Sequence, residues 1–388
     1  NQNHVANTMS SPYYRFDDVD DSITISSFPL VAQTSASGGY SVECLFRYST
    51  GSGSFRGLFE FGDQATGERR GLVLNGSKLA VSHYSDNHEA TTNLVDGQIY
   101  HAVSTVSSAG AVTMYLNGVA EAISSGDGTV ALTSYSGTTA YIGRTGSGEY
   151  FGGEIYHVKV FNNTLTATEV KELYSGASVE YKYKGANQTD INASFDFTSG
   201  WNTTTGVSGT TNNSFTTDAT TGQGIHKALL TVGKKYRVVV AGTTQSGQTF
   251  ELRNSAGGGN TVGSGFGTHE FTATDTSIYL RAETVDGQIN ISTFTIVQIG
   301  AVAEYDGSSA GSKVWGDKSG NGLHGTVGAG TLDATAPTLE NTPYDAGTEY
   351  EEGTFSPTIV SSGGVTLTAG SGNTAQYVRV WNKVTCNG

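Results

Sequence analysis

Short runs in which apolar and polar residues alternate fill roughly the first 175 positions of this 388-residue chain. An alternation with period two places successive side chains on opposite faces of a strand, so each run predicts a β-strand with one buried face. Asn75-Gly76 and Asn117-Gly118 predict hairpin turns, because a type I′ turn needs positive φ at both central positions. The spacing of the runs is typical of an antiparallel sandwich. The runs are residues 22–28, 40–48, 56–62, 70–84, 98–107, 111–122, 139–144 and 152–162.

One stretch, LTATEVKELYSG at residues 165–176, departs from this alternation and predicts a short helix. Thr166 is placed to cap the helix, and Glu169 follows three residues later to complete a capping box. Gly176 stands where a helix commonly ends in a left-handed residue. The apolar stripe of the helix consists of Val170, Leu173 and Tyr174. A helix this short is marginal alone in water, so we expect it to pack against the sheets.

The alternating pattern restarts near residue 190 and predicts a second antiparallel sandwich, similar to jelly-roll carbohydrate-binding modules in its strand order. The next segment is rich in Gly and irregular, so we expect a connector that packs through Tyr305, Trp315 and Leu323. The fold class is therefore all-β, with tandem antiparallel β-sandwich (jelly-roll) domains, one short closing helix and a small C-terminal β region. The predicted boundaries are 1–178, 179–300, 301–348 and 349–388.

Composition and charge agree with a turn-rich β protein and narrow its partners. The chain has 53 Gly, 20 Tyr and 16 Phe but only 5 Pro. Its formal net charge is −14, so we expect neither nucleic-acid binding nor membrane insertion. No apolar run reaches the roughly 18–20 residues that span a bilayer, and the first ten residues lack the pattern of a secretion signal. Cys44 and Cys386 are too far apart in the sequence to predict a disulfide.

Four carboxylates gather within five residues near the N-terminus. Asp17, Asp18, Asp20 and Asp21 offer hard oxygen ligands in a density that suits Ca²⁺, and the alternative is that they solvate an edge strand. A second segment, from Asp317 to Gly322, begins like a calcium-binding loop. Gly328 occupies the position where such a loop needs its bidentate acid, which favours a tight Asx turn instead.

The candidate catalytic patterns are incomplete. Glucanases of sandwich type carry an E-x-D-x-x-E strand, and Asp86 with Glu89 supplies only its second half. Glu149 and Glu154 flank a YFGG bend and are the remaining carboxylate pair. No H-E-x-x-H or phosphate-binding loop motif occurs. We therefore expect a protein without catalytic activity.

Aromatic and amide side chains in predicted loops are suited to binding glycans. A sugar ring stacks on an aromatic face while nearby carboxylates and amides bind its hydroxyls. Packing at the sandwich edge is the alternative role for each of these residues. The candidate glycan-binding residues are Tyr84, Asp86, Asn87, Glu149, Tyr150 and Trp201.

Residues 16–176 resemble the laminin-G-like, concanavalin A-like jelly-roll family. The opening FDDVDDSITI at 16–25 is similar to the first strand of that family. The order MYLNG, then YIGR, then FGGEIYHVKVFNNTLTATEVKELY is similar to its closing strands and helix. The resemblance implies a β-sandwich closed by the helix at 165–176. It implies little about function, because lectins, glucanases and viral adhesins share the fold.

Three segments near the C-terminus resemble bacteriophage tail-fibre and other virion appendage proteins. The similar segments are DKSGNGLHG at 317–325, YEEGTFSPT at 350–358 and the ending at 377–388. This resemblance implies a non-catalytic protein on the virion surface that attaches to host or environmental glycans beside other virion proteins. A glycan depolymerase on a fibre and a secreted bacterial adhesin or lectin are the alternatives.

Such fibres are commonly closed oligomers, so we expect a homotrimer. The terminal strands offer too little apolar surface for a lone domain, and we expect residues 349–388 at the interface, with Tyr377 and Trp381 facing a neighbour.

Overall fold

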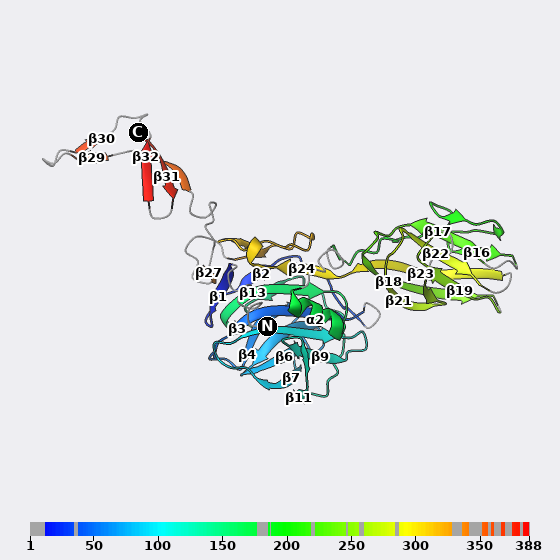
Figure 1. Ribbon diagram of the computed structural model, residues 1–388, viewed down its shortest axis with the longest axis horizontal. Helices are drawn as coiled ribbons and strands as arrows, with labels where there is room; N and C mark the ends of the chain where they lie inside the picture. The colour runs from blue at the N-terminus through cyan, green and yellow to red at the C-terminus, as the bar shows by residue number, and fades with distance from the viewer. Residues whose placement is uncertain are drawn as a thin grey trace.

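Two antiparallel β-sandwiches account for most of the regular structure (Figure 1). The computed structural model describes residues 12–34, 38–176, 185–186, 188–218, 222–245, 247–255, 260–283, 287–327 and 336–340, and the backbone of five strands between residues 351 and 387. Among these residues no helix has both the length and the apolar content needed to cross a membrane. The expectation of an all-β chain of jelly-roll sandwiches is confirmed.

The first sheet of the first sandwich has β3 and β13 at its centre. Its strand order is β10-β9-β8-β3-β13-β1-β27, and β24 also pairs with β13. The strands are β1 (Tyr13–Asp17), β3 (Tyr40–Tyr48), β8 (Ile99–Val106), β9 (Val112–Leu116), β10 (Val119–Glu121), β13 (Gly152–Phe161), β24 (Ala301–Tyr305) and β27 (Thr338–Glu340).

The second sheet packs against the first across a shared core. Its order is β11-β7-β6-β5-β4-β12-β2-β26-β25. The strands are β2 (Ile23–Ile25), β4 (Phe55–Gly62), β5 (Arg69–Asn75), β6 (Lys78–His83), β7 (Asp86–Asn93), β11 (Ile123–Ser125), β12 (Ala140–Ile142), β25 (Val314–Trp315) and β26 (Gly325–Thr326).

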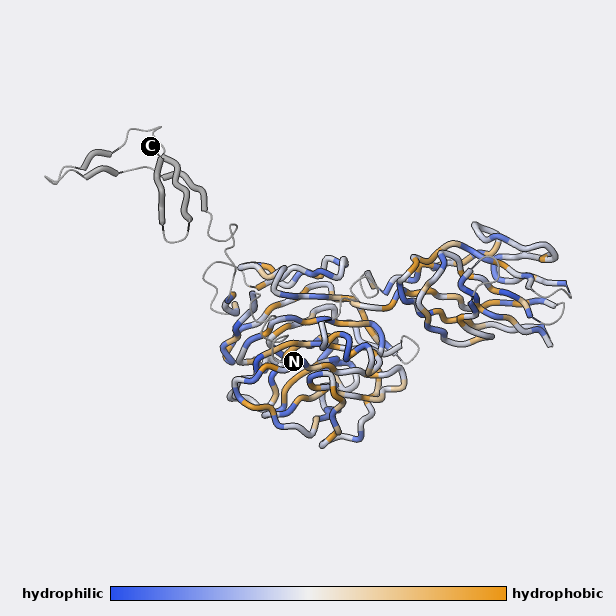
Figure 2. Tube along the Cα trace, in the orientation of Figure 1, coloured by the Kyte–Doolittle hydropathy of each residue, from blue (hydrophilic) through white to orange (hydrophobic). Residues whose placement is uncertain are grey.

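Strand alternation explains why these sheets face each other, and orange and paler positions alternate along many strands in Figure 2. On β3, Val42, Cys44 and Phe46 are fully buried in the core between the sheets. Glu43, between the first two, therefore points to the outer face of the first sheet. Burying a side chain of the size of Phe46 contributes about 1.5–3 kcal/mol, so this repeated pattern fixes which face lies inside.

Residues 301–327 and 338–340 return to the first sandwich, whereas the sequence predicts an irregular connector at 301–348. β24 pairs with β13, β27 pairs with β1, and the β25–β26 hairpin extends the second sheet beside β2. The expected packing of Tyr305, Trp315 and Leu323 against the core is confirmed. Asp317 accepts the N–H of Ser319 at 2.9 Å, which confirms the Asx turn.

The second sandwich is built from two five-stranded sheets around its own core. One sheet has the order β14-β17-β22-β19-β20, formed by Asn202–Thr203, Gly224–Ala228, Ser277–Ala282, Phe250–Arg253 and Thr261–Ser264. The other has the order β15-β16-β23-β18-β21, formed by Val207–Ser208, Ser214–Thr217, Gly287–Ile299, Lys235–Thr244 and Gly267–Thr272. β23 leads directly into β24, so the chain re-enters the first sandwich at the point where β13 ends (Figure 1).

Asn162 joins the two sandwiches at this point. Its Oδ1 accepts the N–H of Gly300 at 2.7 Å, and its Nδ2 donates to Gln188 Oε1 and to the Gln298 carbonyl at 2.8 and 3.1 Å. Its own carbonyl accepts Arg237 at 3.2 Å. Asn162 is fully buried, so every one of these bonds replaces a bond to water.

The predicted closing helix is confirmed as α2 (Ala167–Ser175). Thr166 and Glu169 form the capping box, and Gly176 ends the helix with φ 69°. The helix packs on the outer face of the first sheet, where Val170 is fully buried and Leu173 is partly buried. The sheet side of this contact consists of Val103, Tyr115, Phe161 and Ala301, together with Leu165 ahead of the helix.

The C-terminal region contains two small antiparallel sheets. β28 (Glu351–Phe355), β31 (Ala375–Val380) and β32 (Lys383–Asn387) form one, and β29 (Thr358–Val360) pairs with β30 (Thr366–Thr368) in the other. Tyr377 lies on β31, opposite Gly353, and its side chain is outside the described residues. Trp381 also lies outside them. The predicted contribution of residues 349–388 to an oligomer interface remains a prediction.

Replacing Val170 with Asp should destabilise the first sandwich by about 2–4 kcal/mol, because the change removes a core side chain and buries an unpaired charge. Leu173→Asp should cost less, since Leu173 is partly exposed. Lys171→Asp on the exposed face is the control and should stay within about 0.5 kcal/mol. Urea unfolding followed by fluorescence measures all three; equal midpoints for Val170→Asp and the control would contradict the packing of α2.

Candidate functional site

The outer face of the second sheet carries a row of small and polar side chains. Phe59 and Phe61 on β4 point into the core, so Glu60 between them points outward. Gly71 on β5 is the cross-strand partner of Glu60, and Ser82 on β6 is the partner of Gly71. A Cβ on Gly71 would lie 3.3 Å from Glu60 Cγ, so the glycine leaves room for the carboxylate stem.

Glu60 is a buried carboxyl with an altered acidity. It is 2% exposed, Arg69 Nε lies 3.2 Å from its Oε2, and the N–H of Gly146 donates to its Oε1. Burial raises the pKa of Glu60 to about 7, while Arg69 opposes the rise and the charge of Glu149 adds to it. The carboxyl is therefore in position to gain or lose a proton near neutral pH.

Arg69 links this row to an exposed aromatic ring. Its guanidinium carbon lies 5.0 Å from the centre of the Tyr84 ring, and its NH2 group donates to Ser147 Oγ at 2.5 Å. Tyr84 occupies the tight turn between β6 and β7 with φ 69° and is 42% exposed. The ring is thus held by a cation while part of its surface stays accessible.

Asp86 and Asn87, the next predicted glycan-binding residues, have different surroundings. Asn87 pairs with Ser82 in the outer row, and its Oδ1 has no hydrogen-bond partner among the described residues. Asp86 Oδ1 lies 3.3 Å from Nε2 of the buried His88. The Oδ1 atom of Asn87 is buried, so a ligand at this face does not reach it, and Asp86 already has an internal partner.

An open hollow of about 440 Å³ lies at the rim of the sandwich. Three loops form it: the turn after β1, the β3–β4 loop and the β12–β13 loop. The lining residues are Asp18, Ser52, Gly53, Ser54, Phe55, Gly148, Glu149 and Tyr150. The structure therefore brings Glu149 and Tyr150, which the sequence identified, together with Asp18 in one concavity.

Internal hydrogen bonds hold the rim loops in place. Asp18 Oδ2 accepts the N–H and the hydroxyl of Ser52 at 2.6 and 2.8 Å. Glu149 Oε2 accepts the hydroxyl of Thr145 at 2.7 Å. Arg144 lies between two aromatic rings, with its guanidinium carbon 4.0 Å from the centre of Tyr141 and 6.0 Å from that of Tyr150. The hollow is therefore formed before a ligand arrives, which lowers the entropic cost of binding.

Trp201 lies away from this region, in the core of the second sandwich. It is 8% exposed, and its ring centre lies 5.2 Å from Phe197 and 5.5 Å from Phe294. The sequence prediction of Trp201 as a glycan platform is corrected here, because a ring packed in this way offers no face to a sugar.

The acidic cluster divides into two parts. Ligand oxygens of Asp17, Asp20 and Asp21 lie within 4.8 Å of one another, while Asp18 turns away to Ser52. Asp17 Oδ1 accepts the N–H groups of Val19, Asp20 and Asp21 at 2.9, 3.2 and 3.4 Å. Burial, followed by repulsion from Asp17, raises the pKa of Asp21 to about 6. Three carboxylates fit the oxygen chemistry of Ca²⁺, although one oxygen already serves the turn.

Glu149 and Glu154, the carboxylate pair considered from the sequence, have separate environments. Glu154 Oε2 accepts Arg47 Nε at 2.7 Å and also the hydroxyl of Tyr156. The carboxylate that acts electrostatically with Glu149 is Glu60 instead. The sequence analysis missed Glu60, and its position between two buried phenylalanines in LFEF was the available signal.

The geometry at this end of the sandwich suits a polar, uncharged ligand. Phe55, Tyr84 and Tyr150 offer ring surface, Asp18 and Glu149 offer carboxylate acceptors, and the β3–β4 loop offers serine hydroxyls. Sugars are bound by this combination of ring faces and directional acceptors.

Residues 17–171 match the Laminin_G_3 family, described as the concanavalin A-like lectin/glucanases superfamily. The match confirms the laminin-G-like, concanavalin A-like jelly-roll domain that the sequence predicts. No curated protein matches the chain.

Three solved structures are similar to parts of the chain at low identity. A heptameric SAP-like pentraxin from Limulus polyphemus is 16% identical, with a TM-score of 0.35, over 44% of this chain and 85% of its own. A putative carbohydrate binding protein from Bacteroides ovatus ATCC 8483 is 14% identical, with a TM-score of 0.33, over 75% of this chain and 62% of its own. A sialidase from Trypanosoma rangeli is 17% identical, with a TM-score of 0.31, over 37% of this chain and 24% of its own.

The raised pKa of Glu60 predicts a pH dependence of stability. The folded state binds this proton more tightly than the unfolded state. The contribution of Glu60 to the free energy of unfolding is therefore complete below about pH 4.5, the pKa in the unfolded chain, and is lost as the pH rises through about 7. Urea unfolding between pH 5 and 8.5 should therefore show a loss of up to about 3 kcal/mol from this group. Glu60→Gln should flatten the profile; parallel profiles for the two proteins would contradict the assignment.

Proposed function

We propose that this chain is a non-catalytic glycan-binding attachment protein of a virion surface, and that the rim hollow is its sugar site. The observation that carries the proposal is the placing of Asp18, Glu149 and Tyr150 around one preformed concavity. Its volume lies in the usual range for small-ligand pockets. The second sandwich acts as a companion module, set beside the first by the bonds of Asn162.

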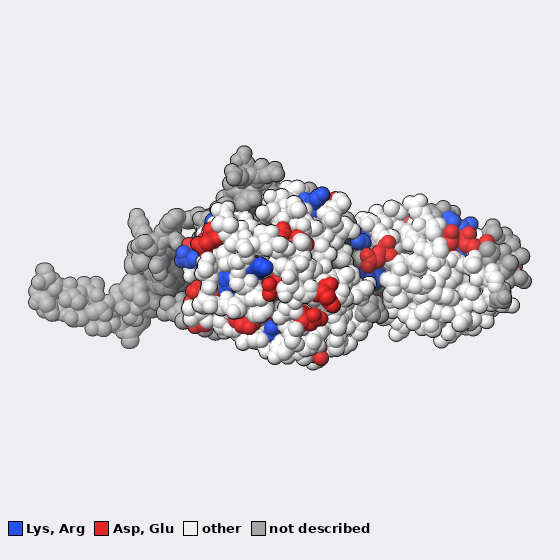
Figure 3. Space-filling model, turned by 90° about the horizontal axis from the view of Figure 1, so that it is seen from below, with Lys and Arg blue, Asp and Glu red and all other residues white. Residues whose placement is uncertain are grey.

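The acceptors in the hollow favour a neutral polysaccharide. Asp18 and Glu149 repel acidic sugars and accept hydrogen bonds from neutral hydroxyls. Acidic side chains are scattered over the face seen in Figure 3, which disfavours polyanionic partners in the same way.

The placement on a virus particle draws on the likeness of residues 317–325, 350–358 and 377–388 to virion appendage proteins. Other virion proteins and a homotrimeric state belong to this proposal, since several weak sugar sites in one assembly bind with high avidity. A secreted bacterial adhesin or lectin would use the same hollow in a different setting.

Hydrolysis of the glycan is the second candidate function, and one observation favours it. Glu60 has a pKa of about 7 beside the charge of Glu149. A carboxyl with a raised pKa near a second carboxyl is the arrangement that glycoside hydrolases use for general acid and nucleophile or base. We favour binding because the carboxyl of Glu60 is held by Arg69 and by the rim loop.

Glu149→Gln and Tyr150→Ala should each weaken retention of the full-length protein on surface polysaccharide about tenfold or more, because each removes a contact in the hollow. Glu154→Gln is the matched control, since Glu154 is bonded to Arg47 outside the hollow, and it should bind like the parent. A glycan array followed by affinity electrophoresis measures the effect. If Glu154→Gln lost binding to the polysaccharide while Glu149→Gln and Tyr150→Ala kept it, the hollow would not be the sugar site.

The same preparations separate binding from hydrolysis. The parent protein should release no reducing sugar from the polysaccharide that it binds, and light scattering should report a trimer. Steady release that Glu60→Gln abolishes would replace the binding proposal with the hydrolase. A monomer in solution and on the particle would remove the avidity argument.

Ca²⁺ bound by Asp17, Asp20 and Asp21 would hold the turn that presents Asp18 to the hollow. Millimolar Ca²⁺ should then raise the thermal midpoint of the full-length protein by a few degrees, since a ligand of the folded state stabilises it. Asp20→Asn should remove the rise. If Ca²⁺ left the thermal midpoint of the parent unchanged, the three carboxylates would only stabilise the turn and would not bind Ca²⁺.

A further inference from the structure

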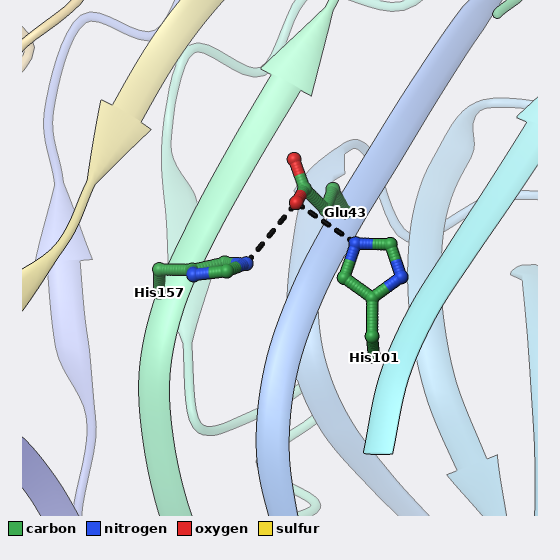
Figure 4. A group of neighbouring side chains, drawn as sticks. All are labelled: Glu43, His101 and His157. Atoms are coloured by element: carbon green, nitrogen blue, oxygen red, sulfur yellow. Dashed lines mark hydrogen bonds and ion pairs between the residues drawn. The ribbon is translucent and has the colours of Figure 1, made fainter. Parts of the chain in front are cut away.

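Three central strands of the first sheet bring Glu43, His101 and His157 together on its outer face (Figure 4). Glu43 comes from β3, His101 from β8 and His157 from β13, on either side of β3. Glu43 Oε1 lies 3.0 Å from His101 Nε2 and 3.1 Å from His157 Nε2. The two imidazoles therefore converge on a single carboxylate oxygen.

The group is buried and its rings are fixed by packing. Glu43 is fully buried, His101 is 3% exposed, and the His157 side chain is 15% exposed at the open side. Tyr174 of α2 lies over His101, with ring centres 5.5 Å apart. The closing helix thus limits the rotation of one imidazole, while the side near His157 remains open to solvent.

The local charge is suited to a cation. Lys159 Nζ lies 3.4 Å from Glu43 Oε2, and Glu304 is the cross-strand partner of Lys159. Two carboxylates therefore accompany one ammonium. Although burial acts to raise it, Lys159 and both imidazoles hold the pKa of Glu43 well below its usual range. Burial lowers the pKa of His157, which favours the neutral ring that metals bind.

We propose that Glu43, His101 and His157 form a binding site for a divalent transition metal of the Zn²⁺ type. Two imidazole nitrogens and one carboxylate oxygen are a donor set that Zn²⁺ uses, with a fourth position left for water. The three ligand atoms lie within 4.8 Å of one another. Tetrahedral bonds of about 2.0–2.1 Å separate ligands by about 3.3 Å, so a small widening of the present contacts admits the ion.

The donors also define which cations the site takes. Ca²⁺ and Mg²⁺ prefer six or more oxygen ligands, whereas imidazole suits Zn²⁺, Ni²⁺ and Cu²⁺. Metal binding requires each Nε2 to give up its proton to Nδ1. For His101 the shift exchanges the Nε2–H bond to Glu43 for the bond to the metal, and it places the proton on Nδ1, which is buried and has no hydrogen-bond partner among the described residues.

The bound ion links three adjacent strands under the closing helix. β8, β3 and β13 each contribute one ligand, so the metal adds a cross-strand connection that the backbone ladders do not provide. The site lies on the outer face of the first sheet, and the hollow proposed for sugars is lined by none of its residues. The two proposals therefore stand or fall separately.

The test uses the full-length protein, stripped of metal with a chelator, and Zn²⁺ alone at pH 7.5. Calorimetric titration should give one Zn²⁺ per chain, and a hundredfold excess over Kd should raise the thermal midpoint by about 5 °C or more. Ca²⁺ at the same concentration should leave the thermal midpoint of the Asp20→Asn variant unchanged. This variant is used because it lacks the acidic cluster that is expected to bind Ca²⁺. Co²⁺ should give the visible absorption of a four- or five-coordinate ion. At pH 5 the effects should weaken, because protons compete with the metal for its ligands.

His101→Gln and His157→Gln are the decisive variants, because glutamine still donates to Glu43 but supplies no imidazole ligand. Each should lose the Zn²⁺ shift and weaken binding about a hundredfold or more, a few kcal/mol when converted at 1.4 kcal/mol per tenfold. His226→Gln, in the second sandwich, is the matched control and should behave like the parent. The proposal would be overturned if the parent bound no stoichiometric Zn²⁺, or if both variants bound Zn²⁺ as tightly as the parent. The Co²⁺ spectrum of the parent decides the question if a variant fails to fold.

Discussion

The buried side chain of Asn162 determines how this molecule is assembled. Its amide and backbone groups bond to residues on both sides of the second sandwich, at the point where β13 ends and β24 begins. An amide buried without these partners would cost about 1–3 kcal/mol for each unsatisfied group. These bonds form only when Gln188 and Gly300 both lie beside Asn162, which places the start of β24 next to the end of β13.

The long strand β13 extends this constraint to the candidate sites. Its first half pairs with β1 and its second half with β24, while β3 lies along its other edge. The rim loop that carries Glu149 and Tyr150 enters β13 at one end, and His157 projects from its middle. The register that places the hollow therefore also places the imidazole. A shift of β13 by one residue would move His157 to the opposite face of the sheet.

The sequence predicted the features that depend on near neighbours. Thr166, Glu169 and Gly176 define the helix within a dozen residues, and strand alternation separates core from surface on β3. It did not predict that β24 and β27 return to the first sandwich, because their partners lie more than a hundred residues away and their strands are short. Glu60 and Glu43 were missed for the same reason: Arg69, Glu149 and the two histidines reach them only through strand pairing. Trp201 was misassigned because aromatic composition does not distinguish a core ring from an exposed one.

The pairing of β1 with β27 has a mechanical consequence. Tyr13 lies opposite Glu340 in an antiparallel ladder, so tension applied at these two residues pulls on the same end of the pair. Such a load breaks the hydrogen bonds of the ladder one after another, beginning at Tyr13 and Glu340, and does not load all of them at once. The second sandwich lies on a side branch, between two strands that are both fixed to the first. Stretching the chain between these residues would open the β1–β27 ladder first and leave the second sandwich without load.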